Sequence, residues 1–372
     1  MEFIDLKTRH QLIGNRINSR IQKVMGHGQF ILGPEVRELE NKLAQYTGSK
    51  HCVTVSSGTD SLLIALMALG VRAGDEVITV PYTWISTAEV IALLGAKPVF
   101  VDIRYDTFNM DETLLESAIT EKTKAIIPVS IYGQCPNMNE INIIAKKYEI
   151  SVIEDAAQSF GASCKGENFC NLSLIGCISF FPSKPLGCYG DGGALFTNDD
   201  ELAEKFRCIS IHGQKSKCNH PIHGINGRFD TIQAAILLEI LELFPEEVKK
   251  REEVGATYSS ALSEVENVDT PFIGEYNTSV FAQYTILSEK RELIQQSLKQ
   301  NGIPSVSYYS VPLHLQPVFK NLRHEIGDFP VTEKVADQCL SLPMSPYIST
   351  QDQIQVIDMV CSYSTELKVE SN

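Results

Sequence analysis

The chain has 372 residues, a length that suits one large domain joined to a smaller one. With 43% hydrophobic and 21% charged residues, its composition is that of an ordinary globular protein. The 46 acidic residues outnumber the 32 lysines and arginines and give a net charge of −14, which disfavours general binding to nucleic acid or to an anionic membrane. An anionic substrate would therefore need a locally positive pocket.

The cysteine pattern and the start of the chain predict a cytoplasmic protein. Ten cysteines are scattered singly without a Cys-x-x-Cys pair, which is typical of reduced thiols, so neither a disulfide framework nor a metal site is expected. The first seven residues are acidic and lack the apolar core of a signal peptide. The longest apolar run, 62–69, is far too short to span a bilayer.

The first half of the chain predicts alternating helices and strands. A first helix is expected over 16–24, a Gly-rich loop over 26–33, and a second helix that begins at Pro34 and ends at Gly48. Short apolar strands then alternate with helical patterns, at 52–55, 76–80, 98–101, 124–129 and 151–154. This spacing predicts a mostly parallel sheet covered by helices on both faces.

The second half predicts a smaller C-terminal α/β domain. A polar segment, 212–228, is expected to be an exposed loop. An apolar stripe then leads to Pro245, which should kink or end its helix, and the domain junction is placed there. The predicted domains are therefore 1–245 and 246–372. The second should contain helices at 246–262, 292–301 and 350–362 and a strand at 282–287.

One lysine and one aspartate indicate a particular chemistry. Lys184 lies among aromatic and proline residues at the end of an apolar strand, before a Gly-rich run. A lone lysine in a loop is most often a surface residue. However, Asp155 ends a short buried strand, where open α/β sheets place ligands. A lysine that forms an imine and an aspartate that keeps a pyridinium nitrogen protonated are the two parts that a pyridoxal phosphate (PLP) enzyme needs.

A phosphate site is expected where the first strand turns into a helix. Gly58 and Thr59 begin that helix, and free backbone N–H groups and the helix dipole make such a junction an anion site. Taken alone, the pair could equally be an ordinary helix cap. With Lys184 and Asp155 present, the cofactor phosphate is the better interpretation, and the Ser179 hydroxyl would form a second wall.

At these residues the chain resembles the DegT/DnrJ/EryC1/StrS sugar aminotransferases, within fold type I of the PLP-dependent transferases. The resemblance runs from about residue 3 to 343, and four motifs occur in the family's order: Ser57-Gly58-Thr59-Asp60, Glu154-Asp155-Ala156-Ala157-Gln158, Ser179-Phe180-x-x-x-Lys184 and Gly190-Asp191-Gly192-Gly193. Within the family, the chain looks most like the aminotransferases acting on UDP-2-acetamido-2-deoxy-3-oxo-glucuronate.

The resemblance implies further roles around the cofactor. Trp84, which by default would be a core aromatic, would stack on the pyridine ring, and Gln158 would lie near the ring hydroxyl. Asn226 would reach the phosphate of the neighbouring subunit's cofactor, so a homodimer with shared active sites is expected. Gly28 and Phe30 belong to a loop that in the family lies beside the sugar nucleotide.

The substrate contacts are also expectations. Arg228 could pair bidentately with a sugar carboxylate, although it could instead form an ion pair with Asp230. Ser183, Tyr308 and Tyr309 would complete the sugar contacts. Tyr308 stands where the family commonly has histidine, and a tyrosine donates a hydrogen bond but cannot carry imidazolium charge.

The reaction implied is the transfer of an amino group from glutamate to a 3-oxo nucleotide sugar, in the biosynthesis of amino sugars for surface polysaccharide. Lys184 would move the proton during this transfer. Glutamine is an alternative donor. An aminotransferase for a dTDP- or UDP-linked 4-oxo-6-deoxyhexose is the close alternative, and a non-catalytic regulator with the same fold is another. A related sugar dehydratase is disfavoured because those enzymes have histidine at the position of Lys184.

Overall fold

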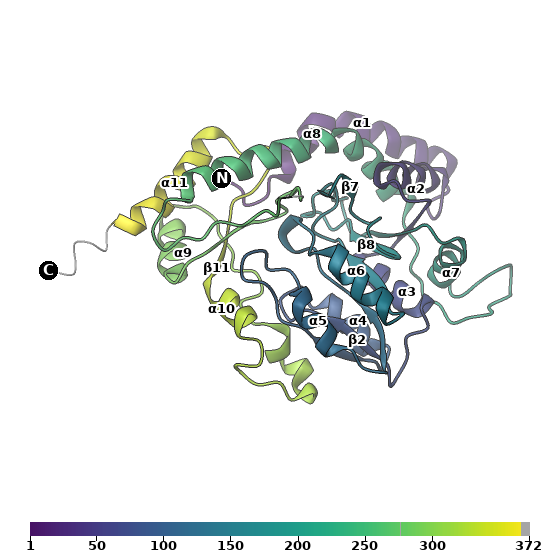
Figure 1. Cartoon of the computed structure of the whole chain (residues 1–372). Helices are drawn as coiled ribbons and strands as arrows, with labels where there is room; N and C mark the ends of the chain where they lie inside the picture. The colour runs from purple at the N-terminus through teal and green to yellow at the C-terminus, as the bar shows by residue number, and fades with distance from the viewer. Residues whose placement is uncertain (276, 366–372) are drawn as a thin grey trace.

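A seven-stranded sheet forms the centre of the protein (Figure 1). The computed structural model describes residues 1–275 and 277–365. The strand order is β1 (His51–Val55), β9 (Gly193–Thr197), β8 (Ile175–Ser179), β5 (Ser151–Asp155), β4 (Thr123–Ile126), β2 (Glu76–Thr79) and β3 (Lys97–Phe100). Only β9 runs against the others, since it pairs antiparallel with both β1 and β8. The prediction of a mostly parallel sheet is therefore confirmed, and the five predicted strands of the first half all occur.

Helices cover both faces of this sheet because successive strand residues are buried on opposite sides. Val77 and Ile153 pack on one face, whereas their neighbours Ile78 and Val152 pack on the other. The first face is covered by α3 (Gly58–Ala68), α4 (Ser86–Leu93) and α7 (Asp200–Ser210). The second is covered by α2 (Pro34–Thr47), α5 (Glu112–Ala118), α6 (Met138–Lys147) and the first half of α8 (Thr231–Leu262). Two apolar layers, one on each face, thus hold the strands of the sheet and their carboxyl ends in place.

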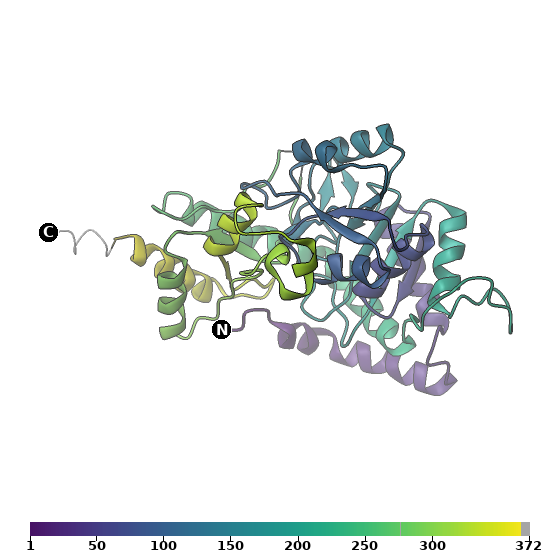
Figure 2. The same cartoon turned by 90° about the horizontal axis from the view of Figure 1, so that it is seen from below.

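The N-terminal helix α1 (Leu6–His27) lies along α8, as both views show (Figures 1 and 2). It is longer than the predicted helix over 16–24 because Asp5 caps its start, accepting a hydrogen bond from the Thr8 N–H at 2.9 Å. Arg16 and Arg20 both form ion pairs with Glu239 of α8. The arm before α1 reaches the C-terminal part, where the Met344 N–H donates to the Phe3 carbonyl at 3.1 Å.

Helix α8 corrects the prediction at Pro245. The expected helix over 246–262 is not a separate element. It is the second half of α8, a single helix of 32 residues that continues through Pro245. A proline inside a helix removes one hydrogen bond and costs about 3 kcal/mol or more. Contacts on both sides offset this cost: Phe244 is fully buried in the main core, and Glu247 forms a buried ion pair with Arg9 at 2.8 Å. The predicted boundary at 245 therefore falls within a helix.

The C-terminal part has its own small core around a two-stranded sheet. Strands β10 (Tyr284–Leu287) and β11 (Cys339–Leu342) pair antiparallel, with α9 (Arg291–Gln300) and α11 (Thr350–Thr365) packed nearby. The remaining short elements are β6 (Ser163–Cys164), β7 (Glu167–Asn168), η1 (Ile131–Gly133), η2 (Leu313–Leu315), η3 (Pro317–Leu322) and α10 (Pro330–Gln338). The division into 1–245 and 246–372 stays a prediction, and its last residues, 366–372, lie outside the described part of the chain.

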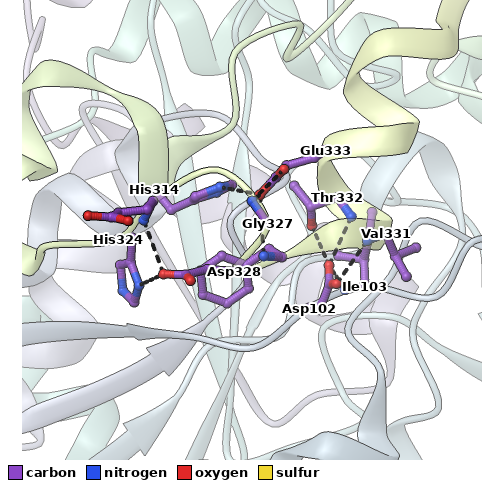
Figure 3. A network of polar contacts seen from close by, with 11 residues as sticks. Asp102, Ile103, His314, His324, Gly327, Asp328, Val331, Thr332 and Glu333 are labelled. Atoms are coloured by element: carbon purple, nitrogen blue, oxygen red, sulfur yellow. Dashed lines mark hydrogen bonds and ion pairs between the residues drawn. The ribbon is translucent and has the colours of Figure 1, made fainter.

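A polar network joins the two parts (Figure 3). Asp102, just after β3, accepts hydrogen bonds from the Val331 and Thr332 N–H groups and from the Thr332 hydroxyl, at 2.7–3.0 Å, and so caps the start of α10. Nearby, the Leu313 N–H donates to the Pro81 carbonyl at 2.8 Å. These contacts hold the segment after Tyr308 and Tyr309 against the sheet edge. Among residues 1–275 and 277–365, no helix is long and apolar enough to cross a membrane.

Candidate active site

A pocket of about 360 Å³ lies at the carboxyl ends of the central strands. Residues that directly follow β1 line it, as do Asp155 at the end of β5 and Ser179 at the end of β8. Tyr308 and Tyr309 close it from the C-terminal part. Ligands in open α/β sheets bind at this edge, because helix N-termini and loops converge there.

Asp155 and Lys184 face this pocket together. Asp155 is 5% exposed, and its carboxylate accepts hydrogen bonds from the Thr87 hydroxyl at 2.8 Å and the Ala157 N–H at 3.3 Å. Burial raises the pKa of Asp155, while the Thr87 hydrogen bond and the charge of Lys184 partly oppose that rise. Burial likewise lowers the pKa of Lys184, against the attraction of Asp155. Burial thus makes the neutral, nucleophilic form of the Lys184 amine easier to reach, and it leaves the Asp155 carboxylate in need of a cationic partner.

The loop that carries Lys184 is held from behind by the two long helices. The Lys184 N–H donates to the Phe181 carbonyl at 2.8 Å, which closes a turn. Arg9 of α1 donates to the Pro185 carbonyl at 3.1 Å, and the same guanidinium pairs with Glu247 of α8. Because Arg9 is only 4% exposed, this contact is well shielded from water and fixes the backbone directly after the lysine.

The residues predicted to bind a phosphate, here called the anion cradle, lie at the start of α3 and beside Ser179 at the end of β8. Ser57 caps the helix through its hydroxyl, which accepts from the Asp60 N–H at 3.0 Å, so the N–H groups of Gly58 and Thr59 have no partner within the helix. A β-carbon added to Gly58 would lie 2.6 Å from the Ser179 Cβ, so only glycine permits this close approach. The Thr59 hydroxyl lies 2.9 Å from the Ser86 hydroxyl. This donor set suits a phosphate group.

The two residues assigned to the cofactor ring also line the pocket. Trp84 is 61% exposed, so it is not the core aromatic that its residue type would suggest. Gln158 is buried and firmly oriented: its Oε1 accepts from the Tyr132 N–H at 2.9 Å, and its Nε2 donates to the Tyr309 hydroxyl at 2.9 Å. The Tyr309 hydroxyl keeps its own hydrogen for another acceptor. The roles of Trp84 and Gln158 towards the ring stay predictions.

The predicted substrate residues, together with Asn226, which was predicted to bind the cofactor phosphate, divide into two groups. Ser183, Tyr308 and Tyr309 line the pocket, whereas Gly28, Phe30, Asn226 and Arg228 do not. Arg228 lies beside the end of β1, through its bridge to Val55, and the Ser56 N–H donates to the Gly227 carbonyl at 3.1 Å. Phe30 is 45% exposed, and its carbonyl accepts from the Thr231 N–H at 2.9 Å. Among the described residues Arg228 makes no ion pair, so the alternative pairing with Asp230 does not occur there.

Several pocket residues were missed by sequence reasoning. Thr87 binds Asp155, Ser86 extends the anion cradle, and Gln283 enters from just before β10. Ser86 and Thr87 come two and three residues after Trp84, so the ligand-facing strand end at Trp84 was a usable signal. Nothing local to Gln283 indicated the site, because it is brought there by the packing of the C-terminal part.

Comparisons with known proteins show which family the chain belongs to. The DegT/DnrJ/EryC1/StrS aminotransferase family matches residues 11–361. The chain is 54% identical, over 98% of its length and 99% of the relative, to a UDP-2-acetamido-2-deoxy-3-oxo-D-glucuronate aminotransferase of Pseudomonas aeruginosa. It is 45% identical to a pleiotropic regulatory protein of Geobacillus stearothermophilus, over 97% of each chain.

A solved structure has the same fold as this chain. The crystal structure of NtdA from Bacillus subtilis, with bound cofactor PMP, superposes with a TM-score of 0.90 at 31% identity, covering 97% of this chain and 83% of that one. The fold is that of the fold type I aminotransferases. The chain belongs to the DegT/DnrJ/EryC1/StrS aminotransferase family.

The contact between Thr87 and Asp155 predicts a change in pH dependence. Thr87→Val removes a hydrogen bond that favours the ionised carboxylate, so the pKa of Asp155 should rise further. If activity needs ionised Asp155, the acid limb of the pH profile should move to higher pH than in the wild type. We expect kcat/KM at acidic pH to fall about tenfold, while the alkaline side of the profile is little changed.

The matched control is Thr87→Ser, which keeps the hydroxyl and should keep the wild-type profile. An acid limb of Thr87→Val that coincides with the wild type would show that this hydrogen bond does not tune Asp155.

Proposed function

We propose that this protein is a PLP-dependent aminotransferase that moves an amino group from glutamate to the 3-oxo carbon of UDP-2-acetamido-2-deoxy-3-oxo-D-glucuronate. The observation that carries the proposal is the presence of Lys184, Asp155 and the anion cradle in one pocket. The 54% identity to the P. aeruginosa enzyme supports the choice of substrate. The product would be an amino sugar for surface polysaccharide.

The pocket residues fit the cofactor. The Gly58 and Thr59 N–H groups and the Ser179 hydroxyl would hold its phosphate, and Asp155 would hold its ring nitrogen protonated. Trp84 would lie against the ring. When bound, PLP supplies an electron sink for the carbon that bears the amino group.

Lys184 serves as the proton carrier in this proposal. Its lowered pKa makes the neutral amine available in the pocket. Nζ would accept the proton from the α-carbon of the amino donor as a general base, and later return a proton as a general acid. The Arg9 contact at the Pro185 carbonyl keeps the loop, and therefore Nζ, in position between these acts.

The substrate's carboxylate requires donors that one chain supplies only in part. Among the described residues lining the pocket, Lys184 is the only cation, and Asp155 and Asp191 are acidic. We propose that Arg228 of a second copy supplies the missing charge and that Ser183, Tyr308 and Tyr309 contribute neutral contacts.

A homodimer would place the second group of predicted residues beside the pocket. Asn226 would serve the phosphate of the partner's cofactor, and Gly28 and Phe30 would contact the sugar nucleotide. The large apolar side chains exposed around this region support an interface: Phe30, Ile31, Leu32, Trp84, Phe181 and Tyr189. A cytoplasmic location is proposed with it, supported by ten free cysteine thiols.

A regulatory role is the second candidate, favoured by the 45% identity to the G. stearothermophilus protein. The intact lysine, aspartate and anion cradle favour an enzyme, because a regulator would need none of them. Turnover decides between the two.

The substrate proposal predicts a preference for the acid sugar. Wild type, supplied with PLP and glutamate, should turn over UDP-2-acetamido-2-deoxy-3-oxo-D-glucuronate faster than its neutral hexose counterpart. Arg228→Ala should lower kcat/KM for the acid by about tenfold or more and leave the neutral sugar little changed, since it removes a charge-assisted pair. Steady-state kinetics on both sugars measures this.

Arg228→Lys is the matched variant, because it keeps the charge but loses the bidentate geometry, and should lie between the two. Equal losses on both sugars would make Arg228 structural. A wild type that prefers a 4-oxo-6-deoxy sugar would reassign the substrate, and no turnover of any sugar would favour the regulator.

The shared site predicts complementation between two defective variants. Lys184→Ala and Asn226→Ala should each have little activity alone. In a mixed dimer one site combines the intact Lys184 of one chain with the intact Asn226 of the other, so subunit exchange should restore up to about a quarter of wild-type activity. Activity that stays at the sum of the two parents, in dimers shown to be mixed, would place Asn226 in its own chain's site or outside it.

A further inference from the structure

Gln283 is a buried residue of the pocket, and its side-chain carbonyl has no hydrogen-bond partner among the described residues. It precedes β10, is 8% exposed, and lines the pocket together with Asp155, Lys184 and Tyr309. Its Oε1 is fully buried without a hydrogen-bond partner among the described residues. A buried amide without partners is costly, so proteins keep one chiefly where something else, such as a ligand, completes it.

Gln283 lies between the pocket and a small side cavity. Gln283 also lines a side cavity of about 10 Å³, which it shares with Thr107, whose hydroxyl is likewise buried and unpaired. That volume holds about one water molecule, which would join Oε1 to the Thr107 hydroxyl. If Oε1 accepts a hydrogen bond from that water, Nε2 is the atom left to act as a donor on the pocket side.

The chemistry of the surrounding wall indicates what Nε2 would bind. Tyr308 lines the same pocket, and the Tyr309 hydroxyl, which accepts from Gln158, still has a hydrogen to donate. These groups are neutral hydrogen-bond donors, whereas the acids of the pocket belong to other elements. A cluster of neutral donors in a site with few cations suits a carboxylate, which only accepts hydrogen bonds.

We propose that Gln283 is a carboxylate-binding residue of this site, its Nε2 donating a hydrogen bond to the carboxylate of a bound substrate. The inference rests on the proposed function, in which both the amino donor and the uronate sugar carry a carboxylate. The two half-reactions separate these sources, because each involves only one of the substrates.

The stability of the variants separates binding from structure. Gln283→Leu keeps a similar volume and removes an unpaired buried amide, so the cofactor-loaded protein should keep or increase its Tm. Gln134 is the matched control: it is 5% exposed and lines the same side cavity, but its Nε2 donates to the Phe272 carbonyl at 2.6 Å and its Oε1 accepts from the Gly274 N–H at 3.3 Å. Gln134→Leu should lower the Tm and leave substrate discrimination unchanged.

The deciding experiment follows each half-reaction of the cofactor-loaded enzyme by its absorbance in single turnovers. The probes are L-glutamate, the UDP-linked 3-oxo uronate and its neutral hexose counterpart. Gln283→Leu should raise the apparent Kd of a carboxylate substrate about tenfold and leave the neutral sugar unchanged. Gln283→Glu, which is nearly isosteric, should weaken the same substrate further by repulsion.

An effect confined to glutamate would assign Gln283 to the donor carboxylate, and an effect confined to the uronate would assign it to the sugar; either supports the inference. Unchanged Kd values in both variants, an equal loss on the neutral sugar, or a Tm loss like that of Gln134→Leu would overturn it. Wild type that reacts with none of the probes would instead contradict the proposed function itself.

Discussion

The buried carboxylate of Asp155 is the constraint around which the site is arranged. A carboxylate that is 5% exposed and has two hydrogen bonds is left with part of its desolvation cost unmet, and its pKa is raised accordingly. Among the described residues that line the pocket, Lys184 is the only cation, and burial disfavours its ionised form. A ligand with a protonated ring nitrogen would stabilise Asp155 and leave the lysine amine free for covalent and proton chemistry.

The supporting structure keeps this pair in place from several directions. Strand β5 carries Asp155, the α3 N-terminus stands beside β8, and Arg9 joins α1 and α8 to the backbone behind Lys184. The C-terminal part adds Tyr308, Tyr309 and Gln283 as a wall rich in neutral donors, held by contacts such as Asp102 with α10. The residues expected to carry out the reaction therefore belong to the large sheet and its loops. Much of the discrimination between substrates is expected from the opposite wall and from the second subunit of the proposed homodimer.

Local patterns predicted the parts of the site that adjoin strand ends. Asp155, Ser179 and Gly58 directly end or follow apolar strands, so their place at the sheet edge could be inferred from the sequence. The prediction of a separate helix after Pro245 was wrong because helix-breaking by proline is a local tendency. The burial of Phe244 and the Arg9–Glu247 ion pair outweigh it. Gln283 could not be found because its pocket position depends on how distant elements pack. Arg228 and Asn226 were placed by resemblance, and the single chain leaves them outside its pocket.

The most direct test of the account is the identity of the residue that holds the cofactor. Purified protein loaded with PLP would be reduced with hydride, digested, and its peptides sequenced by mass spectrometry. The account predicts that the reduced cofactor is attached to the peptide carrying Lys184, and that Lys184→Ala yields no labelled peptide. Attachment to another lysine in the wild type, or no attachment at all, would contradict it.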